Sequence, residues 1–406
     1  MNNLINNIGC WINTRFPLAT LWKEHMSEYY SPKNFNFWYY FGSLSILIFG
    51  MQVLSGIWLT MFYNPSSAEA FDSVEYIMRD VTFGWLIRYL HSTGASFFFL
   101  VVYLHIFRGF LYGSYKKPRE LLWIIGVIIF LCLLAECFFG YLLPWGNMSF
   151  WGAQVITSLF SAIPIIGNTL VEWLRGDYTV SGATLNRFFS LHVSAMPLIF
   201  LILITVHILA LHEVGSNNPD GIEIKDNKNK DGIPVDGIPM HPYYTIKDLF
   251  GFSVFFIFFF YIVFFIPDFY GFFLEAPNYM PADKLATPEH IAPVWYMTPY
   301  YAILRAVPNK LAGVIAMGAS IAILFIVPWL DRSPVKSIRY KGLLSKIALM
   351  IFTISFFILG YLGMEPPSEM KTLLAQICSF IYFAFFLLMP IYTSLEKTKK
   401  VPDRVK

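Results

Sequence analysis

The chain has 406 residues, of which 56% are hydrophobic, 19% are aromatic and only 14% are charged. This composition excludes an ordinary soluble globular protein and predicts a polytopic membrane protein. The formal net charge of +3 gives no reason to expect nucleic acid as a partner.

Apolar runs long enough to cross the hydrocarbon layer of a membrane recur along the whole chain. A helix of about 20 residues spans roughly 30 Å of hydrocarbon. The predicted spans lie at about 37–62, 84–112, 121–143, 186–211, 248–267, 304–329, 343–363 and 371–393. The sequence therefore predicts an all-α integral membrane protein with eight transmembrane helices.

The basic residues are distributed unevenly between the two sets of connecting segments. One set contains most of the Lys and Arg and comprises residues 1–33, 113–120, 213–247, 331–342 and those after 393. The opposite loops contain only Arg79, Arg175 and Lys284. By the positive-inside rule, we expect both termini in the cytoplasm.

The order of these segments predicts five regions. They are a surface amphipathic segment (1–33), a four-helix domain (34–212), a cytoplasmic loop (213–247), a second four-helix domain (248–393) and a basic tail (394–406). Residues 144–185 form a long, apolar and aromatic outer loop, which favours the roof of a site over a linker.

The four cysteines form no CxxC pair and no CxxCH motif. They are Cys10, Cys132, Cys137 and Cys378. This spacing argues against covalent haem attachment, an iron–sulfur cluster or a zinc knuckle within the chain.

Two predicted spans each contain a pair of histidines. His91 and His105 are 14 residues apart, which on a helix is about 21 Å of rise and roughly 40° of rotation. His192 and His207 are 15 residues apart, or about 22 Å and 60°. Antiparallel packing would place His91 opposite His192 in the outer half and His105 opposite His207 in the inner half.

Two bis-histidine sites stacked across a membrane suit haems that transfer electrons without binding substrate at the iron. A structural zinc ion would need four ligands at each site. Arg88 and Arg108 lie three residues outward of His91 and His105, where each can pair with a haem propionate. We therefore expect the first four helices to form a bundle around two b-type haems.

Glycines in the flanking spans repeat at the same period. Gly42 and Gly56 are 14 residues apart, and so are Gly126 and Gly140. Glycine permits close helix packing in membranes and lets a flat macrocycle approach the backbone. Two alternatives remain at this point: a secondary transporter with proton-relay histidines, and a haem-b anchor subunit of another quinone dehydrogenase.

From about residue 35 to 390 the chain resembles the cytochrome b subunit of the cytochrome bc complex, a quinol–cytochrome c oxidoreductase, in its bacterial form. The matching stretches run collinearly and include "RYLHSTGAS", "HIFRG", "GYLLPWGNMSFWGAQVIT", "LHEVGSNNP", "HPYYTIKD" and "PVWY". The resemblance implies quinol oxidation at an outer site, electron transfer through two haems and quinone reduction at an inner site. It also implies a contribution to a proton gradient.

The resemblance implies partners and cofactor roles as well. The partners are a Rieske-type iron–sulfur subunit, a cytochrome c1-type subunit and a soluble or membrane cytochrome c downstream, in a dimeric complex surrounded by membrane lipid. His91 and His192 would hold the low-potential haem b, and His105 and His207 the high-potential one. The residues expected near propionates are Arg88, Arg108 and Arg187.

The resemblance also implies two quinone sites. The residues expected at the inner site are His212, Ser216, Lys247 and Asp248. Those expected at the outer site are Tyr141, Gly152 and the segment Pro293–Tyr296, which contains Val294, Trp295 and Tyr296, with Tyr301 as a weaker candidate.

The chain departs from the family pattern at the outer site. The most familiar form of the motif is PEWY, whose glutamate accepts a proton from quinol, and here that position is Val294. Glu136 is an ionisable residue inside an apolar span, which is costly unless it has a function. We predict that Glu136 accepts the proton, with Glu289 and His290 as alternatives.

A second departure is the 15-residue spacing of His192 and His207, where mitochondrial members have 14. Pro197 lies between them, removes one helical hydrogen bond and permits a kink. The sequence predicts that the helix absorbs the extra residue and that the source is bacterial.

Overall fold

The computed structural model describes residues 2–405, and within them eight helical segments are long and apolar enough to cross a membrane. This confirms the predicted all-α membrane fold. The segments are Phe37–Thr60, Gly84–Tyr112, Glu120–Leu142, Gly182–Val214, Met240–Phe265, Lys310–Leu330, Leu343–Met364 and Glu369–Leu387.

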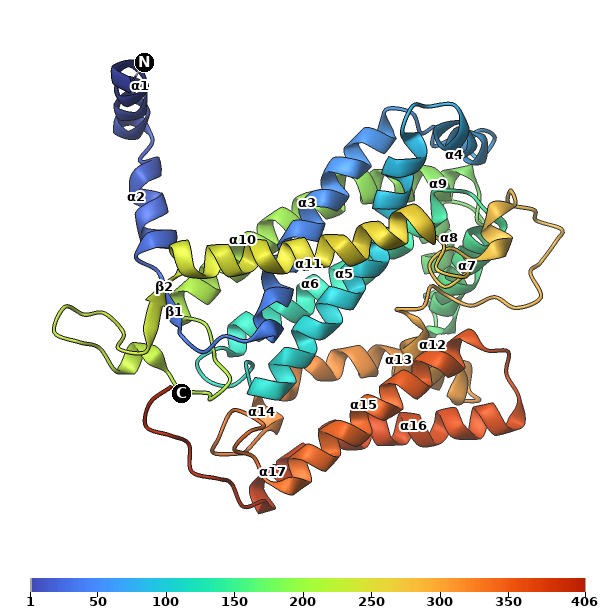
Figure 1. Cartoon of the computed structure of the whole chain (residues 1–406). Helices are drawn as coiled ribbons and strands as arrows, with labels where there is room; N and C mark the ends of the chain where they lie inside the picture. Colours follow the sequence, from blue (N-terminus) through green and yellow to red (C-terminus); the bar gives the residue numbers. More distant parts are fainter. Residues whose placement is uncertain (1, 406) are drawn as a thin grey trace.

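The first four spans form one group of packed helices (Figure 1). They consist of α3 (Tyr40–Thr60), α5 (Gly84–Tyr112), α6 (Glu120–Leu142) and a continuous fourth span made of α9 (Gly182–Ser190), η4 (Leu191–Ala195) and α10 (Met196–Val214). The closest packing joins α3 to α5 and α6 to α10. Each histidine-bearing helix therefore has a glycine-bearing helix as its neighbour.

The remaining spans pack beside this group. The fifth, α11 (Thr245–Phe265), contacts α3 and α5. The others are α13 (Lys310–Ala322), α15 (Leu343–Met364) and α16 (Glu369–Leu387), with the short helix α12 (Thr298–Ala306) packed against all three. Many Phe, Ile and Leu side chains of α11 and α15 are exposed, as expected of helices that face lipid.

The prediction of one sixth span over 304–329 is wrong in its first part. The chain leaves the helical conformation after α12, and α13 begins anew at Lys310. The Asn309 side chain caps α13 by accepting a hydrogen bond from the backbone N–H of Ala312 (2.9 Å). An apolar run alone does not reveal a break that is made by a capping residue.

The outer loop at 144–185 folds into a helical roof. It contains α7 (Asn147–Leu159) and α8 (Gly167–Arg175), and it leads into α9. The buried Arg175 guanidinium donates to Thr157 Oγ1 (2.8 Å) and to the Tyr178 carbonyl (2.9 Å), which ties the roof together. The loop is thus a packed helical layer, and its role as the roof of a site stays a prediction.

The segments predicted to be cytoplasmic meet at the other end of the bundle. Asp236 pairs with Lys33 (3.0 Å) and with Arg404 (2.8 Å), and Glu223 pairs with the buried Arg119 (2.6 Å). The loop at 213–247 therefore binds Lys33 from the first part of the chain and Arg404 from its last part. Asp236 is buried, so water screens its attraction to Lys33 and Arg404 less than it screens an exposed pair, and the cost of desolvating the carboxylate offsets part of this gain.

Two short strands and several short helices complete the structure. β1 (Tyr30–Pro32) pairs antiparallel with β2 (Gly237–Pro239). The helices α1 (Asn2–Arg15) and α2 (Leu18–Trp22) extend away from the bundle (Figure 1). The other elements are η1 (Lys23–Ser27), η2 (Phe37–Tyr39), α4 (Ala70–Arg79), η3 (Phe160–Ala162), η5 (Ile224–Asp226), η6 (Met240–Tyr244), η7 (Ala276–Tyr279), η8 (Ile323–Ile326), α14 (Val327–Leu330) and α17 (Met389–Leu395).

Candidate functional site

The four intramembrane histidines form two pairs at different depths. The ring centroids of His91 and His192 lie 6.0 Å apart, and those of His105 and His207 lie 6.5 Å apart. Both pairs join α5 to the fourth span, as the antiparallel arrangement predicted. Two imidazoles that bind one metal from opposite sides, each at about 2 Å, place their centroids about 6 Å apart.

The extra residue between His192 and His207 is absorbed by η4, a single turn of π-helix. The Met196 N–H donates to the Leu191 carbonyl, so that this turn closes over five residues. A π-turn inserts one residue locally and leaves the helix on either side in α geometry. Pro197, which the sequence-based prediction associated with the extra residue, follows this turn directly and has no N–H to donate to the preceding turn of the continuous span.

Deleting Val193 should convert η4 into an ordinary α-helical turn. The spacing between the two histidines of the fourth span, His192 and His207, would then be 14 residues. We expect the variant to bind the same number of haems as the wild type, because the deletion removes the residue that the π-turn accommodates. Quantification of haem per chain in the purified protein measures this. A variant that loses one haem would show that the π-turn itself is required.

The four repeated glycines lie against the four histidine rings. A methyl group added at Gly140 would lie 2.4 Å from His192 Cε1, and one at Gly56 would lie 3.1 Å from His91 Cε1. A methyl group added at Gly126 would lie 3.3 Å from His207 Cε1, and one added at Gly42 would lie 3.4 Å from His105 Cε1. The glycines therefore make room for the imidazole rings, a more specific role than the general close packing that the sequence predicted.

The outer pair directs one nitrogen of each ring away from its partner. Nδ1 of His91 lies 3.0 Å from Ser55 Oγ, and Nδ1 of His192 lies 3.1 Å from the Glu136 carbonyl oxygen. Ligand histidines commonly engage their second nitrogen in this way, which fixes the ring orientation. Nε2 of each ring is then the nitrogen left for a metal, and the residues fit a bis-histidine haem.

The arginines lie close to the histidine levels but differ in their surroundings. Arg108 Nη2 is 3.1 Å from His105 Nδ1, and its guanidinium lies 4.9 Å from the Tyr39 ring centroid. Its Nε is buried without a hydrogen-bond partner among residues 2–405, as expected of a group that awaits an anionic partner. Arg187 instead donates to the Trp173 carbonyl in the roof.

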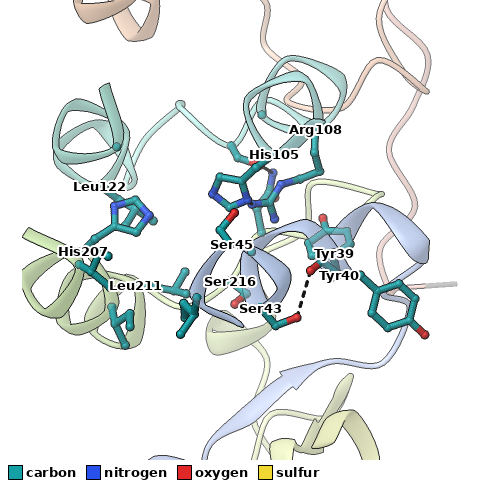
Figure 2. A pocket seen from close by; sticks show the side chains of 18 of the residues that line it. Tyr39, Tyr40, Ser43, Ser45, His105, Arg108, Leu122, His207, Leu211 and Ser216 are labelled. Carbon is teal, nitrogen blue, oxygen red and sulfur yellow. Dashed lines mark hydrogen bonds between the residues drawn. The ribbon is translucent and has the colours of Figure 1, made fainter. Parts of the chain in front are cut away.

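A cavity of about 390 Å³ opens beside the inner histidine pair. Figure 2 shows His105, Arg108 and His207 around it, with Ser43 and Ser216 nearby. This volume lies in the range of about 300 to 1,000 Å³ that is typical of cofactor and ligand sites. The cavity is also lined by the four residues predicted for the inner quinone site: His212, Ser216, Lys247 and Asp248.

The inner site includes residues that the sequence reasoning missed. His25 Nδ1 lies 3.3 Å from His212 Nδ1, and the Tyr29 ring stacks on His212 at 4.2 Å. Ser43 Oγ donates to Asp248 Oδ1 (3.0 Å). His25 and Tyr29 come from the segment before the first span, and no local pattern placed them beside residues near 212.

The outer site is built around Tyr141, which lies at the end of α6 below the roof. Its hydroxyl donates to Glu275 Oε2 (2.9 Å), and a methyl group at Gly152 would contact the Tyr141 ring at 3.8 Å. Burial raises the pKa of Glu275 to about 7. Glu275 was not a sequence candidate, because it lies in a loop and meets Tyr141 only through the fold.

The PVWY segment packs next to this pair. Tyr296 is buried and stacks on Phe99, with ring centroids 3.7 Å apart, and Trp295 Nε1 donates to Ser96 Oγ (3.1 Å). Val294 is also buried. Burial and the nearby Glu275 carboxylate both raise the pKa of Tyr296.

The residues predicted from the sequence to accept the quinol proton make contacts other than the one between Tyr141 and Glu275. Glu136 contacts His192 through its carboxylate (3.1 Å). Glu289 is exposed, and His290 lies near Arg305, with a pKa that burial and this charge hold below its usual value. The Tyr301 hydroxyl donates to the Ile291 carbonyl (3.4 Å).

Comparisons with known proteins agree with this geometry. The chain matches the family described as "Cytochrome b/b6/petB" over residues 26–215 and "Cytochrome b(C-terminal)/b6/petD" over 281–383. The cytochrome b of Allochromatium vinosum is 60% identical over 403 residues, which is 97% of each chain. That of Rickettsia typhi is 49% identical over 401 residues, or 98% of each chain.

Two further comparisons extend this result. The protein named "Cytochrome b/c1" from Bradyrhizobium diazoefficiens is 46% identical over 396 residues, which is 97% of this chain and 56% of that protein. A solved chain of a hyperthermophilic respiratory Complex III superposes with a TM-score of 0.88 at 40% identity, covering 95% of this chain and 98% of that one. The chain therefore belongs to the cytochrome b family, the electron-transferring membrane subunits of respiratory Complex III.

Proposed function

We propose that this chain is the catalytic subunit of a quinol–cytochrome c oxidoreductase and holds two b-type haems. His91 and His192 would bind the outer, low-potential haem, and His105 and His207 the inner, high-potential haem. The observation that carries the proposal is the pair of histidine levels, each with ring centroids near 6 Å and a glycine against every ring. Bound haem supplies a one-electron carrier at each level.

The inner cavity would bind quinone and deliver protons to it. His212 and Asp248 would donate protons to the two quinone oxygens, while Ser216 and Lys247 line the cavity. The exposed His25 contacts His212 and would return a proton to it from the aqueous side. Proton uptake would therefore occur on the side where the basic loops lie.

The outer site would oxidise quinol between Tyr141, Gly152 and the Val294–Tyr296 stretch. We propose Glu275 as the proton acceptor, because it is hydrogen-bonded to Tyr141 and its pKa of about 7 lets it hold or release a proton near neutral pH. Glu136, the sequence-based candidate, contacts His192 instead of Tyr141. Proton release outside and uptake inside, joined by an electron crossing the membrane, would build a proton gradient.

The assembly we propose contains a Rieske-type iron–sulfur subunit and a cytochrome c1-type subunit, in a dimer that passes electrons to a downstream cytochrome c. The similarity to a Complex III chain and to a protein named "Cytochrome b/c1" supports these partners. The ion pairs that join Lys33 and Arg404 to one basic loop support an orientation with both termini in the cytoplasm. The similarity to bacterial cytochromes b supports a bacterial inner membrane as the location.

The proposal predicts two haems per chain that can be removed one at a time. The reduced-minus-oxidised spectrum of the purified complex should contain a b-type band, and haem quantification should give two haems per chain. Replacing His207 with alanine should halve that ratio and stop quinone reduction, because the inner iron loses one of its two ligands. A wild-type complex without a b-type band would contradict the proposal.

A further inference from the structure

The helix α6 carries a short internal repeat that is broken at one position. Gly126 and Gly140 face His207 and His192, and four residues before each glycine lie Leu122 and Glu136. The Leu122 backbone lies beside the His207 ring, and the Glu136 carbonyl accepts a hydrogen bond from His192. Both rings therefore lie against α6, but among residues 2–405 His207 Nδ1 has no hydrogen-bond partner, and only the outer level adds a backbone hydrogen bond and a carboxyl group.

The Glu136 carboxyl group is directed at the outer histidine. His192 Nδ1 lies 3.1 Å from Glu136 Oε1 and also 3.1 Å from the Glu136 carbonyl oxygen, so one N–H can donate to both acceptors. The side chain is only 16% exposed, and its Oε2 is buried without a hydrogen-bond partner among residues 2–405. Within residues 2–405, the hydrogen-bonding partner of the carboxyl group is therefore the ring nitrogen of a proposed haem ligand.

The other histidines have different partners. His91 Nδ1 faces the neutral Ser55 hydroxyl, and His105 Nδ1 faces the Arg108 guanidinium. The charge of Arg88 lies near His91 at the outer level, whereas Arg108 lies 3.1 Å from His105 Nδ1 and is also near His207 at the inner level. The outer level therefore has an acidic group, Glu136, against one ligand, whereas the inner level has a cation, Arg108, against one ligand.

A carboxylate that accepts the Nδ1–H of a ligand imidazole makes the ligand more basic and places negative charge near the metal. Both effects favour the oxidised metal, and hydrogen bonding around a haem is one of the means by which a protein sets its potential. We propose that Glu136 is a positioning residue that lowers the reduction potential of the outer haem through His192. This rests on the proposed function, since it needs His192 to be a haem ligand.

This role differs from proton acceptance by Glu136. A proton acceptor must reach the quinol, and the polar group that meets Tyr141 at the outer site is Glu275. Glu136 contacts His192 instead. The geometry thus assigns the two buried acids to separate tasks, with Glu275 at the substrate and Glu136 at the ligand.

Two substitutions test the proposal by potentiometry of the intact complex at one fixed pH. Glu136→Gln keeps the shape and removes the charge, and Glu136→Leu reproduces the residue type found at the inner level. We expect the midpoint potential of one b haem to rise by at least about 59 mV in both variants, which is a tenfold change in a one-electron equilibrium. The other haem should keep its potential.

Ser55→Ala is the matched control, because it removes a neutral partner of the other outer ligand. Its shift should be smaller than that of Glu136→Gln. Unchanged potentials in Glu136→Gln with both haems bound would overturn the proposal. Loss of the outer haem from both Glu136 variants would also contradict it, because the residue would then serve haem binding. Absence of b haem from the wild type would instead contradict the proposed function.

Discussion

Replacing Gly140 with alanine should remove the outer haem and leave the inner one bound. The new methyl group would lie 2.4 Å from Cε1 and 2.9 Å from Nδ1 of His192, which is closer than real contacts permit. The imidazole cannot yield easily, because the Glu136 carbonyl and carboxyl group hold its Nδ1. Haem quantification should give half of the wild-type value, and quinol-dependent cytochrome c reduction should be lost.

The four glycines should form a graded series in this assay. The added methyl group would lie 3.1 Å from the nearest histidine atom at Gly56, 3.3 Å at Gly126 and 3.4 Å at Gly42. Alanine at these positions should therefore cause progressively smaller losses of haem, because the histidine ring needs to move less in each case. Gly50 is the matched control in α3, since a methyl group there meets nothing within 4 Å. Equal haem loss at Gly50 and Gly140 would mean that alanine disturbs the helices in general, and the close contact with His192 would then explain nothing.

Glu275→Gln should slow quinol oxidation by about 10²-fold or more, the usual contribution of a general base. In the wild type, burial raises the pKa of Glu275 to about 7, so its proton-accepting form increases as the pH rises through 7. The rate of quinol oxidation should rise across the same range, and the variant should lack this rise. Pre-steady-state haem reduction by quinol, measured from about pH 6 to pH 8, tests both expectations.

Glu289→Gln is the control for this experiment, because Glu289 is an exposed acid on the same outer loop. It should retain both the rate and the pH profile. A Glu275→Gln variant with wild-type kinetics would remove Glu275 from the mechanism. If Glu136→Gln alone abolished quinol oxidation, the sequence-based prediction for Glu136 would be supported instead.

The sequence predicted the histidine levels because rare residues in apolar helices carry strong information. An intramembrane histidine is costly, and the period of 14 residues that the glycines share with His91 and His105 relates directly to helix geometry. His91, His105 and the four glycines could therefore be interpreted without the fold. The function of the glycines was predicted only in general terms, since their contact with the imidazole rings depends on how the helices pack.

The parts that were missed arise from long-range contacts or from changes in a single turn. Glu275 meets Tyr141 across 134 residues, and His25 meets His212 across 187. No local pattern encodes such contacts, because each joins two segments that are far apart in the chain and meet only in the folded structure. The π-turn at Leu191–Ala195 was missed because it differs from an α-helix by one hydrogen-bond register and not by residue type.

The π-turn also affects how relatives of this chain should be compared. A gap of one residue between His192 and His207 would ordinarily be taken to mean that the two ligands lie farther apart in one protein than in another. Here the added residue bulges within one turn, so chain length and ligand separation are uncoupled at that point. Families that differ by such a gap can keep the same distance between their two metal levels, and a length difference there is no evidence of a different electron path.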